Sequence, residues 1–248
     1  MPNPPPTRPI IICGYSRTGT TFLQTLLNCH PEIHLSTECQ LRAISATPLL
    51  CAQIARLHRR EHEQWRGLSP DEARVAMLRA VWYYSEPDGL LARRYGNKTP
   101  GNERHFQFFE SVFRCIPPLY IYMVRDPADV LASVKRMPWG RDEPLWLLIA
   151  RFEASLFCMR RFRRRNQARL LTVSIDRATT MDGKRALVEE VFRIIGEEPT
   201  PEVWRFVDQW PIVNPSENRL EVDTRLYQRI LRNPLVRRMR RELGYRSS

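Results

Sequence analysis

A glycine-containing stretch near the amino terminus has nearly the spacing of a phosphate-binding loop. It reads CGYSRTGTT over residues 13–21, with four residues between Gly14 and Gly19. A nucleoside triphosphatase places lysine after the second glycine, where it reaches the β- and γ-phosphates, but Thr20 stands there in this chain. The N–H groups of such a loop still suit one phosphate, and Arg17 adds a planar cation. The stretch predicts a site for a terminal or near-terminal anionic group on a nucleotide; the alternative is a glycine turn that binds nothing.

A second stretch, YMVRDPADVLASVKR, places an arginine eight residues before a serine. Arg125 follows an apolar run, Asp126 and Pro127 begin a helix, and Ser133 falls in the second turn of that helix. A guanidinium and a hydroxyl in this arrangement could bind one phosphate. Helix capping alone explains Asp126 and Pro127, but it does not explain an arginine at the end of an apolar strand.

The elements that must position these residues alternate between strands and helices. Short apolar runs at 10–13, 119–124 and 170–175 predict buried strands, and the segment ARRYGNKTP predicts a further short strand leading to Lys98. Helices are predicted after the glycine loop and after Asp126, and also over residues 40–66, 69–84, 144–165, 184–196 and 225–243, the last with a break at Pro234. The fold class is therefore α/β: a phosphate-loop-like parallel sheet with helices on both faces, in a single domain over residues 9–248 that follows a flexible terminus at residues 1–8.

The composition favours an anionic partner without identifying it. The 39 Lys and Arg residues exceed the 27 Asp and Glu residues, which gives a formal net charge of +12. Nucleic acid, a membrane surface and a phosphorylated small molecule are all compatible with this charge. The six cysteines lack metal-ligand spacing, so we expect no metal site and a reducing compartment. No apolar run could form a signal core or span a bilayer, and we expect a cytoplasmic protein without integral membrane contact.

The two phosphate stretches together resemble a known family. GYSRTGTTFLQTLLNCHPEI resembles the 5′-phosphosulfate loop of sulfotransferases, and YMVRDPADVLASVKR resembles their 3′-phosphate motif. These enzymes use 3′-phosphoadenosine 5′-phosphosulfate (PAPS), whose 5′ side is a single phosphate that carries sulfate. The resemblance implies a 3′-phosphate site at Arg125 and Ser133. It also implies a 5′-phosphate site at Ser16, Arg17, Thr18, Gly19, Thr20 and Thr21.

The resemblance also suggests which residues carry out the chemistry. Tyrosylprotein sulfotransferases keep a glutamate after His-Pro at the separation that Glu38 has from Arg17, and this glutamate is the assigned base. Their similar Asn-Lys-x-Pro segment implies that Lys98, together with Arg17, stabilises the transition state. From residue type alone, Glu38 and Lys98 would be ordinary surface residues, and His30 and His34 would compete as bases because histidine is the most common general base.

The chain departs from the family after its third predicted strand. Many members have Arg-Tyr-Glu-Asp-Leu there, whereas this sequence has SIDRA at residues 174–178, so contacts to adenosine from that strand end are not predicted. Later contacts near Ser216 or Arg219 are a guess, and residues 39–92 are expected to shape the acceptor site. The sequence does not predict the oligomeric state.

The leading hypothesis is a PAPS-dependent sulfotransferase. It would move the sulfuryl group in line, without metal, to a hydroxyl of a tyrosine peptide, a glycan or a lipid, and release adenosine 3′,5′-bisphosphate (PAP). One alternative is a phosphate-loop kinase or nucleotidase with a degenerate loop, which would need acidic ligands for magnesium such as Asp126 or Asp176. The other is a basic nucleic-acid-binding module that uses the arginine run at 160–165; the leading hypothesis expects no nucleic-acid partner.

Overall fold

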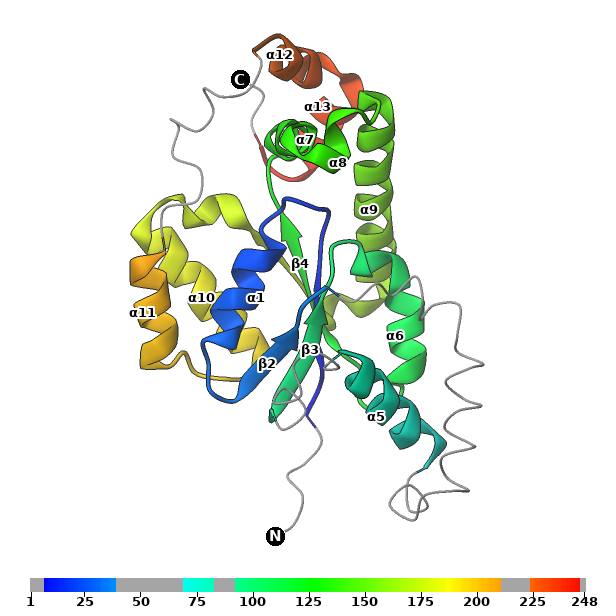
Figure 1. Ribbon diagram of the computed structural model, residues 1–248, viewed down its shortest axis with the longest axis vertical. Helices are drawn as coiled ribbons and strands as arrows, with labels where there is room; N and C mark the ends of the chain where they lie inside the picture. Colours follow the sequence, from blue (N-terminus) through cyan, green and yellow to red (C-terminus); the bar gives the residue numbers. More distant parts are fainter. Residues whose placement is uncertain (1–6, 39–68, 83–91, 211–223, 246–248) are drawn as a thin grey trace.

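A computed structural model describes residues 7–38, 69–82, 92–210 and 224–245 of the chain. These residues contain a five-stranded sheet in the order β2-β3-β1-β4-β5, and every pairing is parallel (Figure 1). The strands are β1 (Ile10–Cys13), β2 (Ile33–Ser36), β3 (Arg94–Lys98), β4 (Leu119–Val124) and β5 (Leu170–Ser174). The predicted α/β class with a parallel sheet is confirmed.

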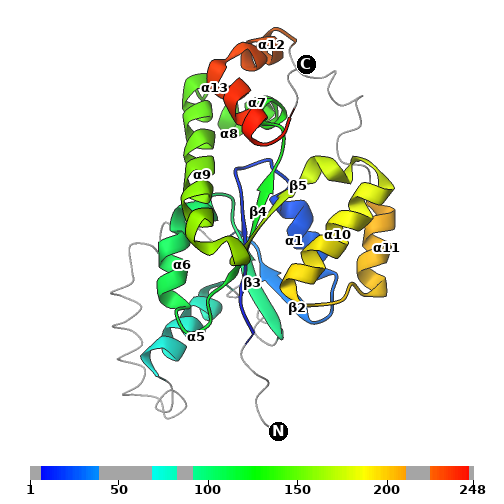
Figure 2. The same ribbon diagram turned by 180° about the vertical axis from the view of Figure 1, so that it is seen from behind.

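Helices cover both faces of the sheet (Figures 1 and 2). One face packs against α1 (Thr20–Asn28), α10 (Met181–Ile195) and α11 (Pro201–Gln209). The other face packs against α5 (Pro70–Trp82), α6 (Phe106–Val112) and α9 (Leu145–Asn166). Beyond the carboxyl end of β4 lie α7 (Pro127–Arg136), α8 (Pro138–Arg141), α12 (Thr224–Arg232) and α13 (Pro234–Glu242).

Strands β1 and β4 are apolar throughout because both of their faces are covered. Ile11 and Cys13 of β1 belong to the core under α9, whereas Ile10 and Ile12 belong to the core under α1. Successive side chains of a strand point to opposite faces, so a position between two helical layers favours an apolar residue. Strand β4 follows the same rule, and all six of its residues are buried.

Three of the predicted helix-end signals coincide with real helix ends. Ser69 and Glu72 form a reciprocal cap at the start of α5: the Glu72 carboxylate accepts from the Ser69 N–H at 2.7 Å, and the Ser69 hydroxyl accepts from the Glu72 N–H at 3.3 Å. Asp126 caps α7 by accepting from the Ala128 N–H at 2.9 Å. Gly196 ends α10 in the left-handed conformation, at φ 73°.

Several elements are absent from the sequence prediction, among them β2, α6 and α11. Strand β2 reads IHLS, too short and too polar to show a strand pattern, and its backbone is held by pairing with β3. The helix predicted over residues 40–66 lies outside the described residues, as do residues 1–6 of the predicted flexible terminus. No helix in the described part of the chain is both long and apolar enough to cross a membrane.

The parallel topology gathers the residues singled out above at one edge of the sheet. Because all five strands run the same way, their carboxyl ends meet at that edge, where ligands bind in open α/β sheets. The glycine loop follows β1, Glu38 follows β2, Lys98 ends β3 and Arg125 follows β4. Strand β5 contributes Asp176 at the same edge.

Candidate active site

The glycine loop between β1 and α1 has a backbone that few other residues could adopt. Gly14 has φ 135°, and a Cβ added there would lie 2.7 Å from the Met123 carbonyl oxygen and 2.8 Å from the Thr18 hydroxyl. Gly19, at φ 95°, precedes the first residue of α1, and no side chain in the described ranges caps that helix. Arg17 has φ 73° although it is not a glycine, and such strain is typical of functional sites. The loop and the uncapped start of α1 together form a site suited to an anion.

The turn that follows β3 supports this loop from inside the protein. The Gly101 N–H donates to the Gly14 carbonyl at 3.0 Å, and the Glu103 carboxylate accepts from the Gly14 N–H at 3.1 Å. Glu103 also accepts from the Ser155 hydroxyl at 2.5 Å. Burial raises the pKa of the Glu103 carboxyl above its ordinary value. Both hydrogen-bonding groups of Gly14 are therefore fixed by the segment that carries Lys98.

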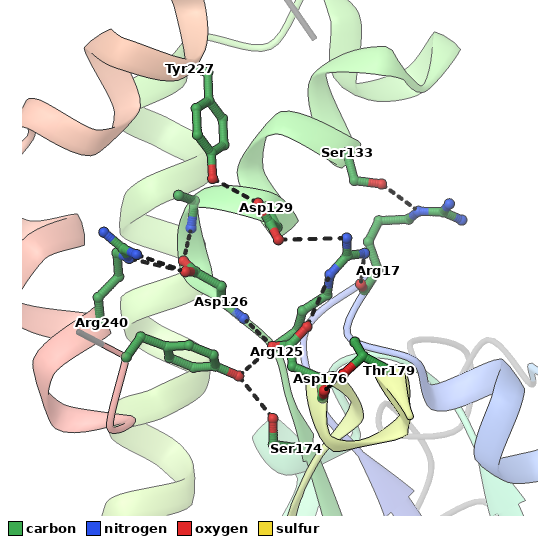
Figure 3. A network of polar contacts seen from close by, with 12 residues as sticks. Arg17, Arg125, Asp126, Asp129, Ser133, Ser174, Asp176, Thr179, Tyr227 and Arg240 are labelled. Carbon is green, nitrogen blue, oxygen red and sulfur yellow. Dashed lines mark hydrogen bonds and ion pairs between the residues drawn. The ribbon is translucent and has the colours of Figure 1, made fainter. Parts of the chain in front are cut away.

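The two predicted phosphate motifs meet in space, although they are about a hundred residues apart in the sequence. The Arg125 Nη1 donates to the carbonyl oxygen of Arg17 at 3.4 Å. The Arg17 Nε donates to the Ser133 hydroxyl at 3.1 Å (Figure 3). One arginine follows β4 and the other lies in the loop after β1, and both line one cavity of about 450 Å³. The cavity thus receives a guanidinium from each motif.

Arg125 is buried between two carboxylates that do not make close contact with it. Its Nη2 lies 4.0 Å from Asp129 Oδ2, its Nε lies 4.0 Å from Asp176 Oδ1, and its side chain is 11 % exposed. The Nε is buried and has no hydrogen-bond partner among the described residues. Burial lowers the pKa of Arg125, and the charges of the two carboxylates act in the opposite direction. The two carboxylates attract the guanidinium without close contact, and its Nε–H donor stays unused by the described residues.

Lys98 and Glu38 form an ion pair beside the loop. The Lys98 Nζ lies 2.8 Å from Glu38 Oε1 and 3.4 Å from the Thr21 hydroxyl. Only 4 % of the Lys98 side chain is exposed, whereas 57 % of the Glu38 side chain is exposed. Lys98 is thus not the surface residue that its isolated position in the sequence would suggest. The pair sets a buried cation and an accessible carboxylate next to the start of α1.

The cavity contains most of the predicted site residues and three that the sequence did not reveal. Its other lining residues are Ser16, Gly19, Thr20, Thr21, Glu38, Pro100, Trp139 and Ile175. Thr18 is buried, and its hydroxyl donates to the Tyr15 carbonyl at 2.7 Å, so this side chain closes the loop internally. Pro100, Trp139 and Ile175 come from three separate segments, and no local pattern marks them as neighbours.

Asp126 and Asp176, the acids that a magnesium-dependent kinase would need, are both engaged by protein groups. Asp126 caps α7, and its Oδ2 lies 3.0 Å from Arg240 Nη2. Asp176 accepts from the Asp126 N–H at 3.0 Å. Of the competing bases, His30 is buried against Phe192, with ring centroids 5.8 Å apart. Ser216 and Arg219 lie outside the described residues, together with much of the segment 39–92.

The family match and the similar solved structures point to the same family. Residues 9–181 match the model of the "Sulfotransferase family". A search of curated proteins gave no match. Similar solved structures include the sulfotransferase domain of the curacin biosynthetic pathway, at 15 % identity and a TM-score of 0.61, with 98 % of this chain and 99 % of that chain covered.

Two further structures share the fold. The sulfotransferase domain of the olefin synthase from Synechococcus PCC 7002 is 16 % identical, with a TM-score of 0.58 and 98 % of each chain covered. Mouse sulfotransferase SULT7A1, complexed with PAP, is 13 % identical, with a TM-score of 0.50, 95 % of this chain and 82 % of that chain covered. At such identities the likeness concerns the fold, and the family match rests on the sequence.

Proposed function

This chain belongs to the sulfotransferase family, and we propose that it transfers the sulfuryl group of PAPS to the hydroxyl of an acceptor and releases PAP. The observation that carries the proposal is the meeting of two arginines at one cavity. Arg17 comes from the loop after β1 and Arg125 from the end of β4. The Arg125 side chain donates to the Arg17 carbonyl, and both residues line the cavity. A nucleotide with a phosphate on each side of its ribose is the ligand that such a pair would bind.

The loop after β1 fits the 5′ end of this donor. Its glycines let the backbone N–H groups approach an anion closely, and α1 adds the positive end of its dipole. The hydroxyls of Thr20 and Thr21 at the start of the helix would donate to the phosphate. Arg17 would neutralise one of its charges, which a planar guanidinium does well.

The site at the end of β4 fits the 3′-phosphate. The buried Arg125 Nε, which makes no hydrogen bond within the described residues, is a donor that this phosphate would engage. The Ser133 hydroxyl, now accepting from Arg17, would supply a further donor. Charge-assisted contacts of this kind are the stronger hydrogen bonds in proteins.

The proposed chemistry assigns one role to each member of the Lys98–Glu38 pair. The acceptor oxygen forms a bond to sulfur as the bond between sulfur and the 5′-phosphate oxygen breaks, and the electron pair leaves with PAP. Glu38 takes the proton of the acceptor hydroxyl. Lys98, with Arg17, offsets the negative charge that grows on the leaving phosphate. Since a sulfate and a single phosphate need less neutralisation than a triphosphate, no metal is required by this proposal.

Two further points support the donor assignment. The mouse sulfotransferase of similar fold is complexed with PAP, the product that we propose here. The positive net charge of +12 suits a donor with several negative charges. For the acceptor we propose a hydroxyl on a tyrosine peptide, a glycan or a lipid.

A thermal-shift comparison of two nucleotides tests this function. PAP at about 100 times its Kd should stabilise the protein by about 2.7 kcal/mol, which raises the Tm by about 5–10 °C for a chain of this size. ATP with magnesium should give a much smaller shift. A response to ATP with magnesium and none to PAP would overturn the proposal in favour of a kinase. Acceptors are then screened with PAPS, with tyrosine peptides, sugars and lipids side by side.

A further inference from the structure

Each carboxylate beside Arg125 is held by a tyrosine from the carboxyl-terminal segment. The Tyr227 hydroxyl, on α12, donates to Asp129 Oδ1 at 2.8 Å (Figure 3). The Tyr245 hydroxyl, just after α13, donates to Asp176 Oδ2 at 2.5 Å. Each tyrosine is far in sequence from the carboxylate that it contacts, by 98 and 69 positions, and both carboxylates lie beside Arg125.

The two oxygens of each carboxylate have different partners. Asp129 presents Oδ1 to Tyr227 and Oδ2 to Arg125, the latter at 4.0 Å. Asp176 presents Oδ2 to Tyr245 and Oδ1 to Arg125, again at 4.0 Å. In both cases the tyrosine fixes the oxygen that faces away from the arginine. The arrangement repeats on two sides of one guanidinium.

This division of contacts keeps the donors of Arg125 available. An unrestrained carboxylate next to a guanidinium tends to form two parallel N–H···O bonds, which use the donors that a phosphate would need. Here each carboxylate is turned so that one oxygen accepts from a tyrosine while the other oxygen lies 4.0 Å from Arg125, outside the geometry of two parallel bonds. At 4.0 Å each carboxylate still attracts the guanidinium, so Arg125 stays in place while its N–H donors remain available for a phosphate.

The carboxyl-terminal segment is fixed to this region by a third contact. Arg240 of α13 donates to Asp126, the cap of α7, and its Nη2 lies 3.0 Å from Asp126 Oδ2. Asp126 in turn donates its N–H to Asp176 at 3.0 Å. The backbone that places Tyr245 is therefore connected directly to the turn that carries Arg125.

We propose that Tyr227 and Tyr245 are positioning residues for the donor 3′-phosphate: they restrain Asp129 and Asp176 so that Arg125 remains open to that phosphate. This inference rests on the proposed function, because it concerns the same nucleotide. It assigns to the carboxyl-terminal helices α12 and α13 a part in donor recognition, although neither tyrosine lines the cavity.

Isothermal titration of the full chain with PAP and with AMP, which lacks the 3′-phosphate, tests the inference. In Y227F and in Y245F the affinity for PAP should fall about three- to tenfold, the range expected when one restraining hydrogen bond to the carboxylate is lost. The affinity for AMP should not change. In steady-state kinetics the same variants should show a higher KM for PAPS at nearly constant kcat.

The matched control is Y120F, because the Tyr120 hydroxyl also donates to a carboxylate, Glu110 at 2.8 Å, away from the site.

A rescue variant separates restraint from a merely structural role. If Asp129 closes on Arg125 once Tyr227 is lost, neutralising it should restore part of the affinity, so Y227F/D129N should bind PAP more tightly than Y227F. A double variant that binds PAP no better than Y227F would overturn the inference, as would equal losses for PAP and AMP. Wild-type protein without preference for PAP over AMP would overturn the proposed function. A wild-type preference that both single variants retain in full would overturn the inference alone.

Discussion

Glu38 and Lys98 form an ion pair, but their side chains differ strongly in solvent exposure. The lysine is nearly buried and has the Thr21 hydroxyl within 3.4 Å, so its charge is directed at the start of α1. The glutamate is more than half exposed, which leaves it room to turn toward an acceptor. A sulfate bound at the loop would compete for Lys98, and this competition would free the carboxylate for proton transfer at the step where it is needed.

The first prediction at the residue scale concerns this carboxylate. E38Q should lower kcat by about 10²–10⁴, because the acceptor proton loses its base. The affinity for PAP should stay unchanged, since glutamine keeps the shape of the side chain. Rates are measured with PAPS and the acceptor that the screen identifies, and binding is measured by calorimetry.

The chain offers a matched control for that variant. Glu32 is also a half-exposed glutamate in an ion pair, 3.0 Å from Arg93, but it precedes β2 rather than following it. E32Q should therefore keep kcat within about twofold, as expected of an exposed ion pair away from a site. If E38Q retained wild-type kcat, or if E32Q lost as much, Glu38 could not be the base.

Residues of the site differ in how far the sequence could reveal them. Arg17, Arg125 and Ser133 lie within two contiguous motifs, whose spacing and resemblance to a known family predict phosphate contacts, and the structure brings the three together. Tyr227 and Glu103 carry no such mark. Both contact residues far along the chain, and local patterns hold no information about partners at that separation.

At the scale of elements, the site depends on how the loop after β1 is enclosed. Its first residue, Gly14, lies against β4 on one side and the turn after β3 on the other. Two requirements therefore coincide there: a positive φ that other residues avoid, and space too small for a Cβ. The turn after β3 has a glycine with only the first requirement, Gly101, at φ 92° with no atom within 4 Å of an added Cβ.

The second prediction compares these two glycines. G101A should cost about 1 kcal/mol of unfolding free energy, the price of an unfavourable φ. G14A carries the same type of strain and adds a clash with the Met123 carbonyl at 2.7 Å, so it should cost about 1–3 kcal/mol more. Urea denaturation of both variants gives the difference. Equal losses would show that the loop can shift to make room, and the enclosed geometry described here would be wrong.

Element prediction from the sequence succeeded where the local signal and the packing agree. The all-apolar runs of β1 and β4 occupy the centre of the sheet, and the caps at Ser69 and Asp126 begin real helices. It failed for β2, which is recruited by pairing with β3 rather than by its own composition. Strand β3 is predicted in the segment ARRYGNKTP, and all five of its residues are buried although its sequence, RYGNK, is polar.

At the scale of the whole molecule, only part of the positive charge of the 39 Lys and Arg residues is available to a ligand. Arg160 and Arg238 both pair with Glu153, and Arg169 pairs with Glu110, so many arginines are already balanced by neighbours. Arg17 and Arg125 differ because they line a cavity. The position of a few arginines, rather than the total charge, therefore distinguishes a nucleotide enzyme from a nucleic-acid-binding module.

The last prediction concerns how far a bound donor reaches through the fold. PAP should slow amide hydrogen exchange in three segments that are distant in the sequence: the loop at 14–21, the strand end and helix at 125–133, and the carboxyl-terminal segment at 227–245. The third segment follows from the contacts of Tyr227 and Tyr245 with the carboxylates around Arg125.

At about 100 times its Kd, PAP should slow the amides that exchange only from the free protein by up to about 100-fold. AMP should protect the first segment alone, and α11, which packs on the opposite side of the sheet from α12, should respond to neither nucleotide. If AMP protected all three segments as well as PAP does, the 3′-phosphate could not be the group that joins them, because AMP lacks it.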